Sequence, residues 1–343
     1  MRNLRIILLC LLLTLVLAIT GCSSPAPSGG STEQEEEELV YPEPGRPIEH
    51  IVGWAAGGGT DVALRAFLSH AEEYVGTKIY TKNIPGAMSA IGTYTVMKSV
   101  PDGYTIAGLT WDSLITAPYW DLVEGYDTDM LELICAFTVH PSIIAVHADS
   151  PWQTLDDFIE DAKARPGEIS ISNVGVGGVN HLPSLDMEQK LGLQFNHITY
   201  TGGSAPQRES LLSRETDAAN LAYSTVAKEV EAGTIRVLGV MGEERDQNIS
   251  DVPTFKELGY DLVWASFRGL AVPKGTPEEI CSYLESKFEE TFFSQKFQDF
   301  ANETAMGQVW MNRQQFTEFI KNTQNNTFPL LDELVAQGVL ERP

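Results

Sequence analysis

The sequence predicts an α/β fold made of two domains. Short apolar segments alternate along the chain with amphipathic segments of helical period, which is the pattern of parallel α/β folds. Two glycine-rich loops, at residues 55–61 and 173–181, each lie between a predicted strand and a predicted helix. The ~300 residues that follow an acidic N-terminal tail are enough for two domains of ordinary size.

Local signals place the elements in order along the chain. Gly76 ends the first helix, the turn Pro101-Asp102-Gly103 precedes the third strand, and Pro166-Gly167 ends the third helix. Strands are expected at 48–54, 78–83, 104–110, 142–147, 168–173, 197–200, 218–221 and 236–241, and helices at 61–75, 89–99, 154–165 and 182–191.

Two further helices are predicted near the C-terminus. Thr276-Pro277-Glu278-Glu279 predicts a capping box with proline at the first helical position. Asn312 and Gln315 predict the start of the next helix by the same pattern.

The first 21 residues predict a lipoprotein signal peptide. Arg2 and Arg5 precede an apolar run of 14 residues, 6–19, which is shorter than the roughly 20 that span a bilayer. Ile19-Thr20-Gly21-Cys22 resembles the bacterial lipobox, which implies cleavage before Cys22 and lipidation of its sulfur. An ordinary signal peptide with a chance cysteine is the alternative. We therefore expect an extracytoplasmic protein, anchored by lipid to a membrane and exposed to the periplasm or the outer cell surface.

Residues 22–45 predict a disordered acidic tether. Serine, proline and glycine dominate residues 23–31, and residues 33–38 hold five glutamates that repel one another. Such a segment cannot bury enough apolar surface to fold.

The charge of the mature chain limits its partners. Without Arg2 and Arg5 it holds 21 basic and 47 acidic residues, a net charge of −26. This balance excludes nucleic acid as a partner, because phosphates need a basic patch. It also means that any site for an anion has to be built locally.

Cysteine and histidine patterns indicate neither metal nor cofactor. Cys10 leaves with the signal peptide, so Cys135 and Cys281 remain, and we expect buried thiols, with one disulfide as the alternative. The chain has no CxxC or HExxH, and its six histidines show no metal-ligand spacing.

The two glycine-rich loops are the candidate ligand site. Glycine lets a backbone approach a ligand closely, and the free N–H groups at a helix start bind anions. In open α/β sheets ligands bind at this position, the carboxyl ends of the strands. A tight turn is the alternative for either loop alone, whereas two loops in different domains favour a cleft. The candidate contacts are Ala56, Gly57, Gly58, Gly59, Thr60 and Asp61 in the first loop and Gly175, Gly177, Gly178, Asn180 and His181 in the second.

Nucleotide binding and catalysis are not supported. Residues 53–60 have a Walker A outline, but Gly59 stands where the phosphate-binding lysine is required. The second loop begins a dinucleotide fingerprint, but Asn180 occupies the position of its third glycine. The chain has no G-x-S-x-G nucleophile elbow, so we expect no enzyme activity.

A series of short motifs from residue 46 onward resembles one family. The chain looks like the substrate-binding component of tripartite tricarboxylate transporters, the Bug family of extracytoplasmic solute receptors. The motifs lie at 46–48, 55–61, 83–87, 101–105, 162–167, 175–181, 200–203, 251–254 and 273–277.

The resemblance implies a fold and a function. The fold is the type II periplasmic-binding-protein fold, with crossover strands at 142–147 and 269–272. Domain 1 would comprise 46–141 and 269–343, and domain 2 would comprise 142–268. Family members hold a carboxylate through backbone amides, hydroxyls and waters, and deliver it to membrane permease subunits. We expect a monomer, and a sensing module for a membrane signalling protein is the alternative function.

The resemblance also implies further contacts in the cleft. A third loop would contribute Thr201, Gly202 and Gly203, and Trp111 and Asp112 would lie near the ligand. The pair Trp111-Asp112 departs from the small polar residues of many relatives. Its acid would disfavour a tricarboxylate such as citrate by charge repulsion, which leaves an amino acid or another ligand with a cationic or hydroxyl group as the alternative.

Three roles stay open on the sequence alone. Asp61 is expected to cap the first helix, with a ligand contact as the alternative. His181 is expected either to cap its helix or to contact the ligand. Arg268 could balance Asp112, reach the ligand, or form an ion pair at the hinge, whereas Arg208 is expected on the surface.

Overall fold

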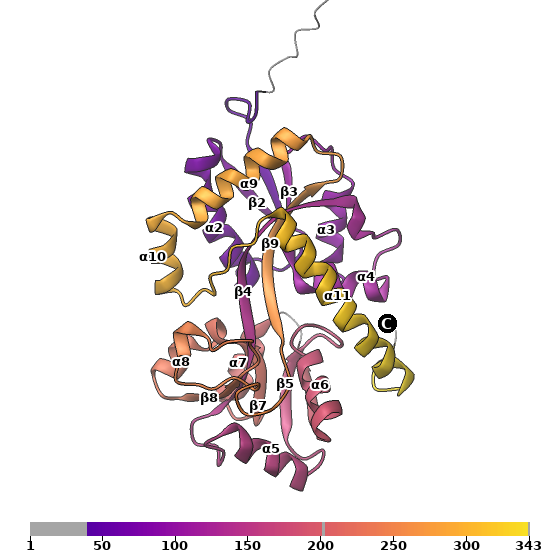
Figure 1. Cartoon of the computed structure of the whole chain (residues 1–343), viewed down its shortest axis with the longest axis vertical. Coiled ribbons are helices and arrows are strands. Elements are labelled where there is room, and N and C mark those ends of the chain that lie inside the picture. Colours follow the sequence, from indigo (N-terminus) through magenta and orange to yellow (C-terminus); the bar gives the residue numbers. More distant parts are fainter. Residues whose placement is uncertain (1–39, 201–202, 342–343) are drawn as a thin grey trace, which may run out of the picture. The chain divides into compact units, whose positions relative to one another are not determined.

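The computed structural model describes residues 40–200 and 203–341, which belong to one compact unit (Figure 1). The predicted signal peptide, Cys22 and the tether up to residue 39 lie outside the described residues, as do Thr201 and Gly202.

The first sheet is mostly parallel. β1 (Ile48–Val52) pairs in parallel with β2 (Ile79–Asn83) on one side and with β3 (Thr105–Thr110) on the other. The long strand β9 (Ala265–Pro273) pairs antiparallel with β3, and β4 (Leu131–His147) pairs antiparallel with β9, so only β9 runs against the other strands of this sheet. We call this sheet, with the helices packed on it, the first lobe.

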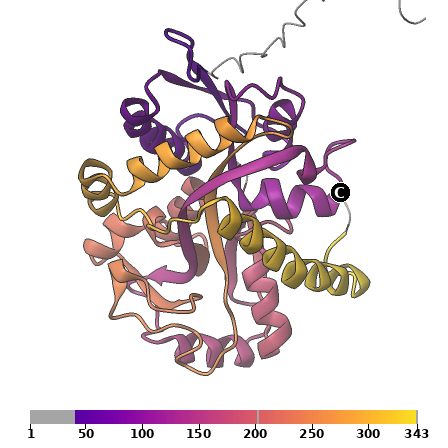
Figure 2. The same cartoon turned by 45° about the horizontal axis from the view of Figure 1, so that its top comes forward.

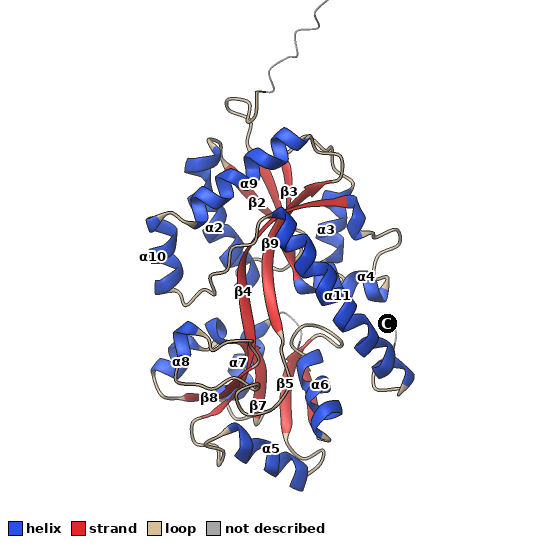
Figure 3. Ribbon diagram, in the orientation of Figure 1, coloured by secondary structure: helices blue, strands red, loops and turns tan. Residues whose placement is uncertain are grey.

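The second sheet grows from the other end of β4. Residues 142–147 of β4 pair antiparallel with β7 (Ala218–Ala222) and with β8 (Ile235–Val240). β7 pairs in parallel with β5 (Ser170–Val174), which pairs in parallel with β6 (Asn196–Tyr200). Figure 3 shows this sheet at the opposite end of β4 from β2 and β3, and we call it, with its helices, the second lobe.

β4 and β9 connect the two lobes, so the expected pair of crossover strands is confirmed. They pair from Leu131↔Pro273 to Pro141↔Ala265 before β4 continues into the second sheet. Both strands are longer than predicted. β4 begins 11 residues before position 142, and β9 covers Ala265–Pro273 rather than 269–272. Two register shifts, at 133–135 and 136–138, interrupt the alternation of apolar and polar residues that would have signalled this strand.

Helices cover the first sheet on two sides. α2 (Gly59–Val75), α9 (Glu278–Phe292) and α10 (Gln295–Glu303) share one apolar core, while α3 (Ala90–Met97) and α11 (Arg313–Ala336) belong to another. Figures 1 and 2 show α9 and α10 on one side of β4 and β9, with α11 on the other.

Four helices belong to the second lobe: α5 (Leu155–Ala164), α6 (Leu182–Leu191), α7 (Ser204–Leu212) and α8 (Ala227–Glu231). Thr154 caps α5, because its hydroxyl accepts from the Asp157 N–H and the Asp157 carboxylate accepts from the Thr154 N–H. The bounds of α6 are those the sequence predicts. α7 was not predicted.

One of the two predicted C-terminal capping boxes is present and the other is wrong. The side chains of Asn312 and Gln315 cap α11 reciprocally. α9 instead has Pro277 at its N-cap, and the Thr276 hydroxyl donates to the Pro273 carbonyl (2.8 Å). Thr276 lies one residue too early, because the helix begins at Glu278.

The last residues of the predicted tether are bound to the first lobe. The Tyr41 ring packs edge-on against Tyr104 and Tyr283, at 5.1 and 5.5 Å between ring centres. The Tyr41 hydroxyl donates to the Gly103 carbonyl (2.8 Å), and the Glu43 N–H donates to the Tyr104 hydroxyl. The packed body therefore extends back at least to residue 41 rather than beginning at 46.

The two remaining cysteines are free and buried, as predicted: Cys135 in β4 and Cys281 in α9. Over the described part of the chain, no helix is both long and apolar enough to cross a bilayer.

Candidate functional site

The first glycine-rich loop connects β1 to α2 and is held by Asp61. The Asp61 carboxylate accepts hydrogen bonds from the Gly57 N–H (2.9 Å), the Asn83 side-chain amide (2.8 Å) and Arg65 Nε (2.8 Å). Burial by itself would raise the pKa of Asp61, but these hydrogen bonds outweigh it and lower the pKa below its ordinary value. Asp61 therefore stays ionised and fixes the loop to α2 and β2.

The start of α2 leaves three backbone donors without helical acceptors. Gly58 is the N-cap, which corrects the expectation that Asp61 caps this helix. Val62 is the first residue whose N–H bonds back to a helical carbonyl, that of Gly58 (2.9 Å). The N–H groups of Gly59, Thr60 and Asp61 precede that first bond, and residues 55–57 are exposed. A helix start of this kind favours an anion.

The second glycine-rich loop uses most of its amides within the protein. The Gly177 N–H donates to His181 Nδ1 (3.0 Å), and the Gly178 N–H reaches the Gly175 carbonyl (3.4 Å). The Val179 N–H points to Asp112 Oδ1 (3.4 Å). The free helix-start amides that the sequence predicts for this loop are therefore largely engaged.

His181 occupies the N-cap position of α6, but its side chain makes no capping hydrogen bond and instead supports the second loop. Its Nδ1 accepts the Gly177 N–H, so the proton of the neutral ring lies on Nε2, which is buried without a partner. Burial, and then the neighbouring His197, lower the pKa of His181 to about 3. The ring therefore remains neutral, with one N–H donor unused.

The second loop lies against the first lobe. A Cβ on Gly178 would stand 2.9 Å from Met88 Cε and 3.2 Å from Asp112 Oδ1, and one on Gly177 would stand 3.2 Å from Trp120 Nε1. A side chain at either glycine would therefore crowd the place where the two lobes meet, and Gly177 also has φ +70°, which favours glycine. The structure brings this loop together with Asp112, whereas the contacts described for the first loop are with α2 and β2.

Asp112 follows β3 and is buried between the lobes. Its side chain is only 6% exposed, and its Oδ1 also accepts from the Thr116 hydroxyl (3.1 Å). Burial raises the pKa of Asp112 to about 6. The neighbouring Trp111 belongs to the core, where its ring packs on Trp264 at 5.7 Å, while its Nε1 is buried without a hydrogen-bond partner among the described residues.

The second lobe holds unsatisfied polar groups that the predicted site omitted. Buried atoms without a hydrogen-bond partner among residues 40–200 and 203–341 include the amide nitrogen of Asn173, the hydroxyls of Tyr200 and Ser184, and both amide atoms of Asn220. Buried polar groups are usually paired, so these atoms are candidates for a ligand or water. Asn173 and Tyr200 lie at the carboxyl ends of β5 and β6, which is the signal that could have identified them.

The remaining predicted contacts are only partly described. Thr201 and Gly202 lie outside the described residues, and Gly203 immediately precedes α7. The Asn180 amide donates to Gln207 Oε1 (3.2 Å), which ties the second loop to α7.

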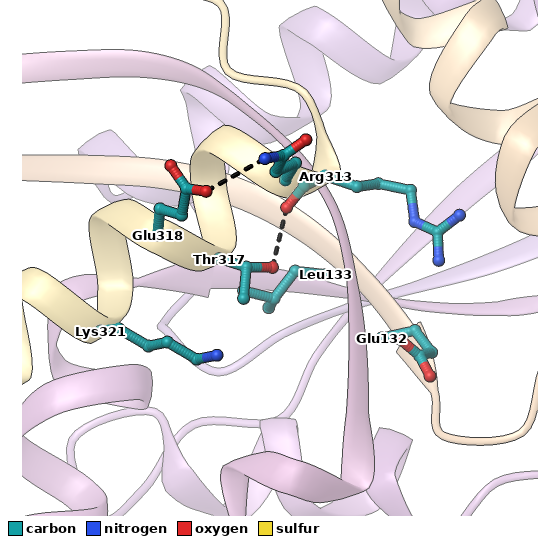
Figure 4. A pocket seen from close by; sticks show the side chains of 7 residues that line it. Glu132, Leu133, Arg313, Thr317, Glu318 and Lys321 are labelled. Atoms are coloured by element: carbon teal, nitrogen blue, oxygen red, sulfur yellow. Dashed lines mark hydrogen bonds between the residues drawn. The ribbon is translucent and has the colours of Figure 1, made fainter.

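A groove of about 380 Å³ lies on α11 and the start of β4, on other elements than the two loops (Figure 4). Its walls carry charges of both signs, from Glu132, Arg313, Glu318 and Lys321. It is an open surface feature with no single preferred ligand charge. Among the residues described, no group of three or more His, Cys, Asp and Glu side chains could hold a metal ion.

Structures with bound carboxylates share the fold. MatC from Rhodopseudomonas palustris, with bound malate, is 19% identical with a TM-score of 0.73, and covers 84% of this chain and 99% of its own. An R. palustris protein with adipate is 24% identical with a TM-score of 0.75, and covers 82% of this chain and 95% of its own. At these identities the likeness establishes the fold.

Closer relatives establish the family. The UPF0065 protein in the gbd 5' region of Cupriavidus necator is 30% identical over 291 residues, which are 85% of this chain and 88% of that protein. A TctC solute-binding protein from Polaromonas, solved without ligand, is 33% identical with a TM-score of 0.72, and covers 86% of this chain and all of its own. Residues 63–335 match the tripartite tricarboxylate transporter family receptor. The chain therefore belongs to this family of extracytoplasmic solute-binding receptors, and the predicted two-domain solute-binding fold is confirmed.

Proposed function

We propose that this protein captures a small organic carboxylate between its two lobes and delivers it to the membrane permease subunits of a tripartite transporter. The observation that carries the proposal is the start of α2, where three N–H groups lack helical acceptors beside an exposed glycine-rich loop. The malate and adipate in two proteins of the same fold support a carboxylate as the ligand class.

The two lobes would contribute different chemistry. The first loop supplies backbone amides and the positive end of a helix dipole. The second lobe supplies the neutral donors of Asn173 and Tyr200, which have no partners of their own. Asp112 adds a negative charge between the lobes, which disfavours a ligand as highly charged as citrate. Receptor function needs no nucleophile, and we expect the ligand to be released unchanged.

The proposal includes the organisation of the whole chain. Cleavage before Cys22 would leave a lipid-anchored mature protein, acting as a monomer on a tether that ends near residue 40. The proposed domains are 41–141 with 269–343, and 142–268, the first boundary being moved from 46 to 41 by the contacts of Tyr41 and Glu43. The crossover strands β4 and β9 make the connections between them.

Gly58→Val tests the role of the first loop. Gly58 has φ −71° and ψ 160°, which valine adopts readily, and an added Cβ would meet only the Ala55 carbonyl, at 3.4 Å. The fold should survive while a β-branched side chain blocks the approach of a ligand to the amides. One lost hydrogen bond to a charged group corresponds to about ten- to a hundredfold in affinity.

The measurement is calorimetry with a panel of mono- and dicarboxylates that includes malate and adipate. Gly58→Ala serves as the smaller step of a graded series, and the melting temperature of each ligand-free variant checks the fold. Gly177→Val is unsuitable, because Gly177 has φ +70° and valine would strain the loop whether or not a ligand is bound. Unchanged carboxylate affinity in Gly58→Val would place the ligand elsewhere, and a wild type that binds no carboxylate would refute the proposed function.

A further inference from the structure

Arg268 lies in β9 at the level where β3 ends, and from there β9 and β4 continue toward the second lobe. In β9 it lies opposite Thr110, the last residue of β3, and opposite Thr138 of β4. Directly opposed residues place their side chains on the same face of a sheet, with Cβ atoms about 5 Å apart. Thr110 accepts a hydrogen bond from Trp54 Nε1 (3.3 Å), and Trp54 immediately precedes the first glycine-rich loop. Arg268 therefore lies at the same end of the first sheet as the start of that loop, where β1 and β3 have their carboxyl ends.

The guanidinium of Arg268 has buried donors without acceptors. Its Nε and Nη1 atoms are buried and make no hydrogen bond with any residue that the structure describes. Within the same described ranges, the hydroxyl of Thr138, on the same face, is also buried and unpaired. Of the ion pairs within the described residues, none includes Arg268, so neither a balance with Asp112 nor a hinge ion pair is formed there.

The neighbouring groups do not neutralise this charge. His140 follows Thr138 on the same face of β4, and burial together with the charge of Arg268 lowers the pKa of His140 to about 3. Burial lowers the pKa of Arg268 to about 10, which still leaves it protonated at neutral pH. Arg268 as a whole is partly exposed, but its Nε and Nη1 donors are enclosed, and enclosed charged donors without acceptors lower stability, so their presence requires a reason other than the ligand-free fold.

We propose that Arg268 is a charged contact for an anionic group of the ligand, which it binds together with the Thr138 hydroxyl. The inference rests on the proposed function and adds that the site recognises the charge of the ligand. The planar guanidinium suits a carboxylate, because two of its N–H groups can donate to the two oxygens in parallel. A local cation also provides the positive charge that an anion site needs in a chain with a surplus of acidic residues.

The test replaces Arg268 with methionine, which keeps an unbranched apolar side chain without the charge, and with lysine, which keeps the charge without the planar fork. The control is Arg236→Met, because Arg236 also lies in a strand and its Nη1 donates to the Trp152 carbonyl (2.9 Å). Calorimetry compares adipate with its neutral diamide, and thermal unfolding follows the ligand-free proteins.

Arg268→Met should weaken adipate binding by about tenfold to a hundredfold or more and abolish the preference for adipate over the diamide. Arg268→Lys should retain part of that preference. The melting temperature of ligand-free Arg268→Met should equal or exceed that of the wild type, because enclosed charged donors without acceptors are removed. Arg236→Met should lower the melting temperature and leave the affinity unchanged.

Two results would overturn the inference while the proposed function stands. In the first, the wild type binds adipate and the affinity of Arg268→Met for adipate is within about twofold of the wild-type affinity. The other is an equal loss of adipate and diamide binding with a lowered melting temperature, which would indicate a structural role. A wild type that binds no member of the carboxylate panel would refute both proposals.

Discussion

Replacing Asp112 with asparagine should stabilise the ligand-free protein at neutral pH. The carboxyl is buried between the lobes, and its pKa is raised from 3.8 to about 6. A shift of roughly two units corresponds to about 3 kcal/mol at 1.36 kcal/mol per unit. The folded protein keeps its proton up to about pH 6, whereas the unfolded chain releases it near pH 3.8. Stability therefore falls as the pH rises through this window, and the full cost is present above about pH 6.

Asparagine carries no charge at any of these pH values, so the variant should not lose stability as the pH rises through this window. Its amide oxygen can still accept from the Thr116 hydroxyl and the Val179 N–H, although neutral acceptors bind more weakly than a carboxylate. We therefore expect Asp112→Asn to be about 1–3 kcal/mol more stable than the wild type at pH 7.5. At pH 4 the difference should be largely gone, because the folded wild type is then protonated.

Urea denaturation followed by circular dichroism at pH 7.5 and pH 4 measures both differences. Asp261→Asn is the matched control, since this side chain is exposed and its replacement should change stability by less than about 0.5 kcal/mol. An Asp112→Asn variant no more stable than the wild type at pH 7.5, or equally stabilised at both pH values, would refute the reasoning. The same variant should bind a fully anionic ligand more tightly, because a like charge has been removed.

Two further changes test the core and the anchor. Phe67→Ala should lower the free energy of unfolding by about 3–5 kcal/mol, because the fully buried ring stacks on Phe137 at 4.1 Å and meets Phe297 edge-on at 5.1 Å; a loss below 1 kcal/mol in urea denaturation would contradict this packing. Cys22→Ala should release the protein from the membrane fraction, and globomycin should cause the wild-type precursor to accumulate. A native protein that is soluble without detergent and begins at another residue would rule out the lipid anchor.

Most helices and the two loops could be predicted because their signals are local. Gly76 takes the left-handed conformation that ends α2, and Asn312 with Gln315 caps α11, each within a few residues of the helix end. The apolar period of a helix is likewise complete within one segment. α4 (Ala117–Trp120) and the preceding π-helical turn at Asp112–Thr116 are only four and five residues long, too short for a helical period of apolar residues to mark them.

The candidate site was predicted only in outline. The positions of both glycine-rich loops follow from their place between a strand and a helix. Which amides remain free depends on partners far away in the chain, such as Asp112, which accepts from Val179 across 67 positions. The same holds for Asn173 and Tyr200, whose lack of partners cannot be known until every neighbour has been placed.

The sequence by itself determined the alternation of strands and helices, the two loops and the acidic balance that requires a local anion site, because each depends on composition or on residues close together in the chain. Only the tertiary structure decided that β4 runs unbroken from one lobe to the other and that Asp61 holds the first loop. It also decided that Arg268 has no carboxylate partner among the described residues, since burial and pairing are properties of strands that meet from distant segments.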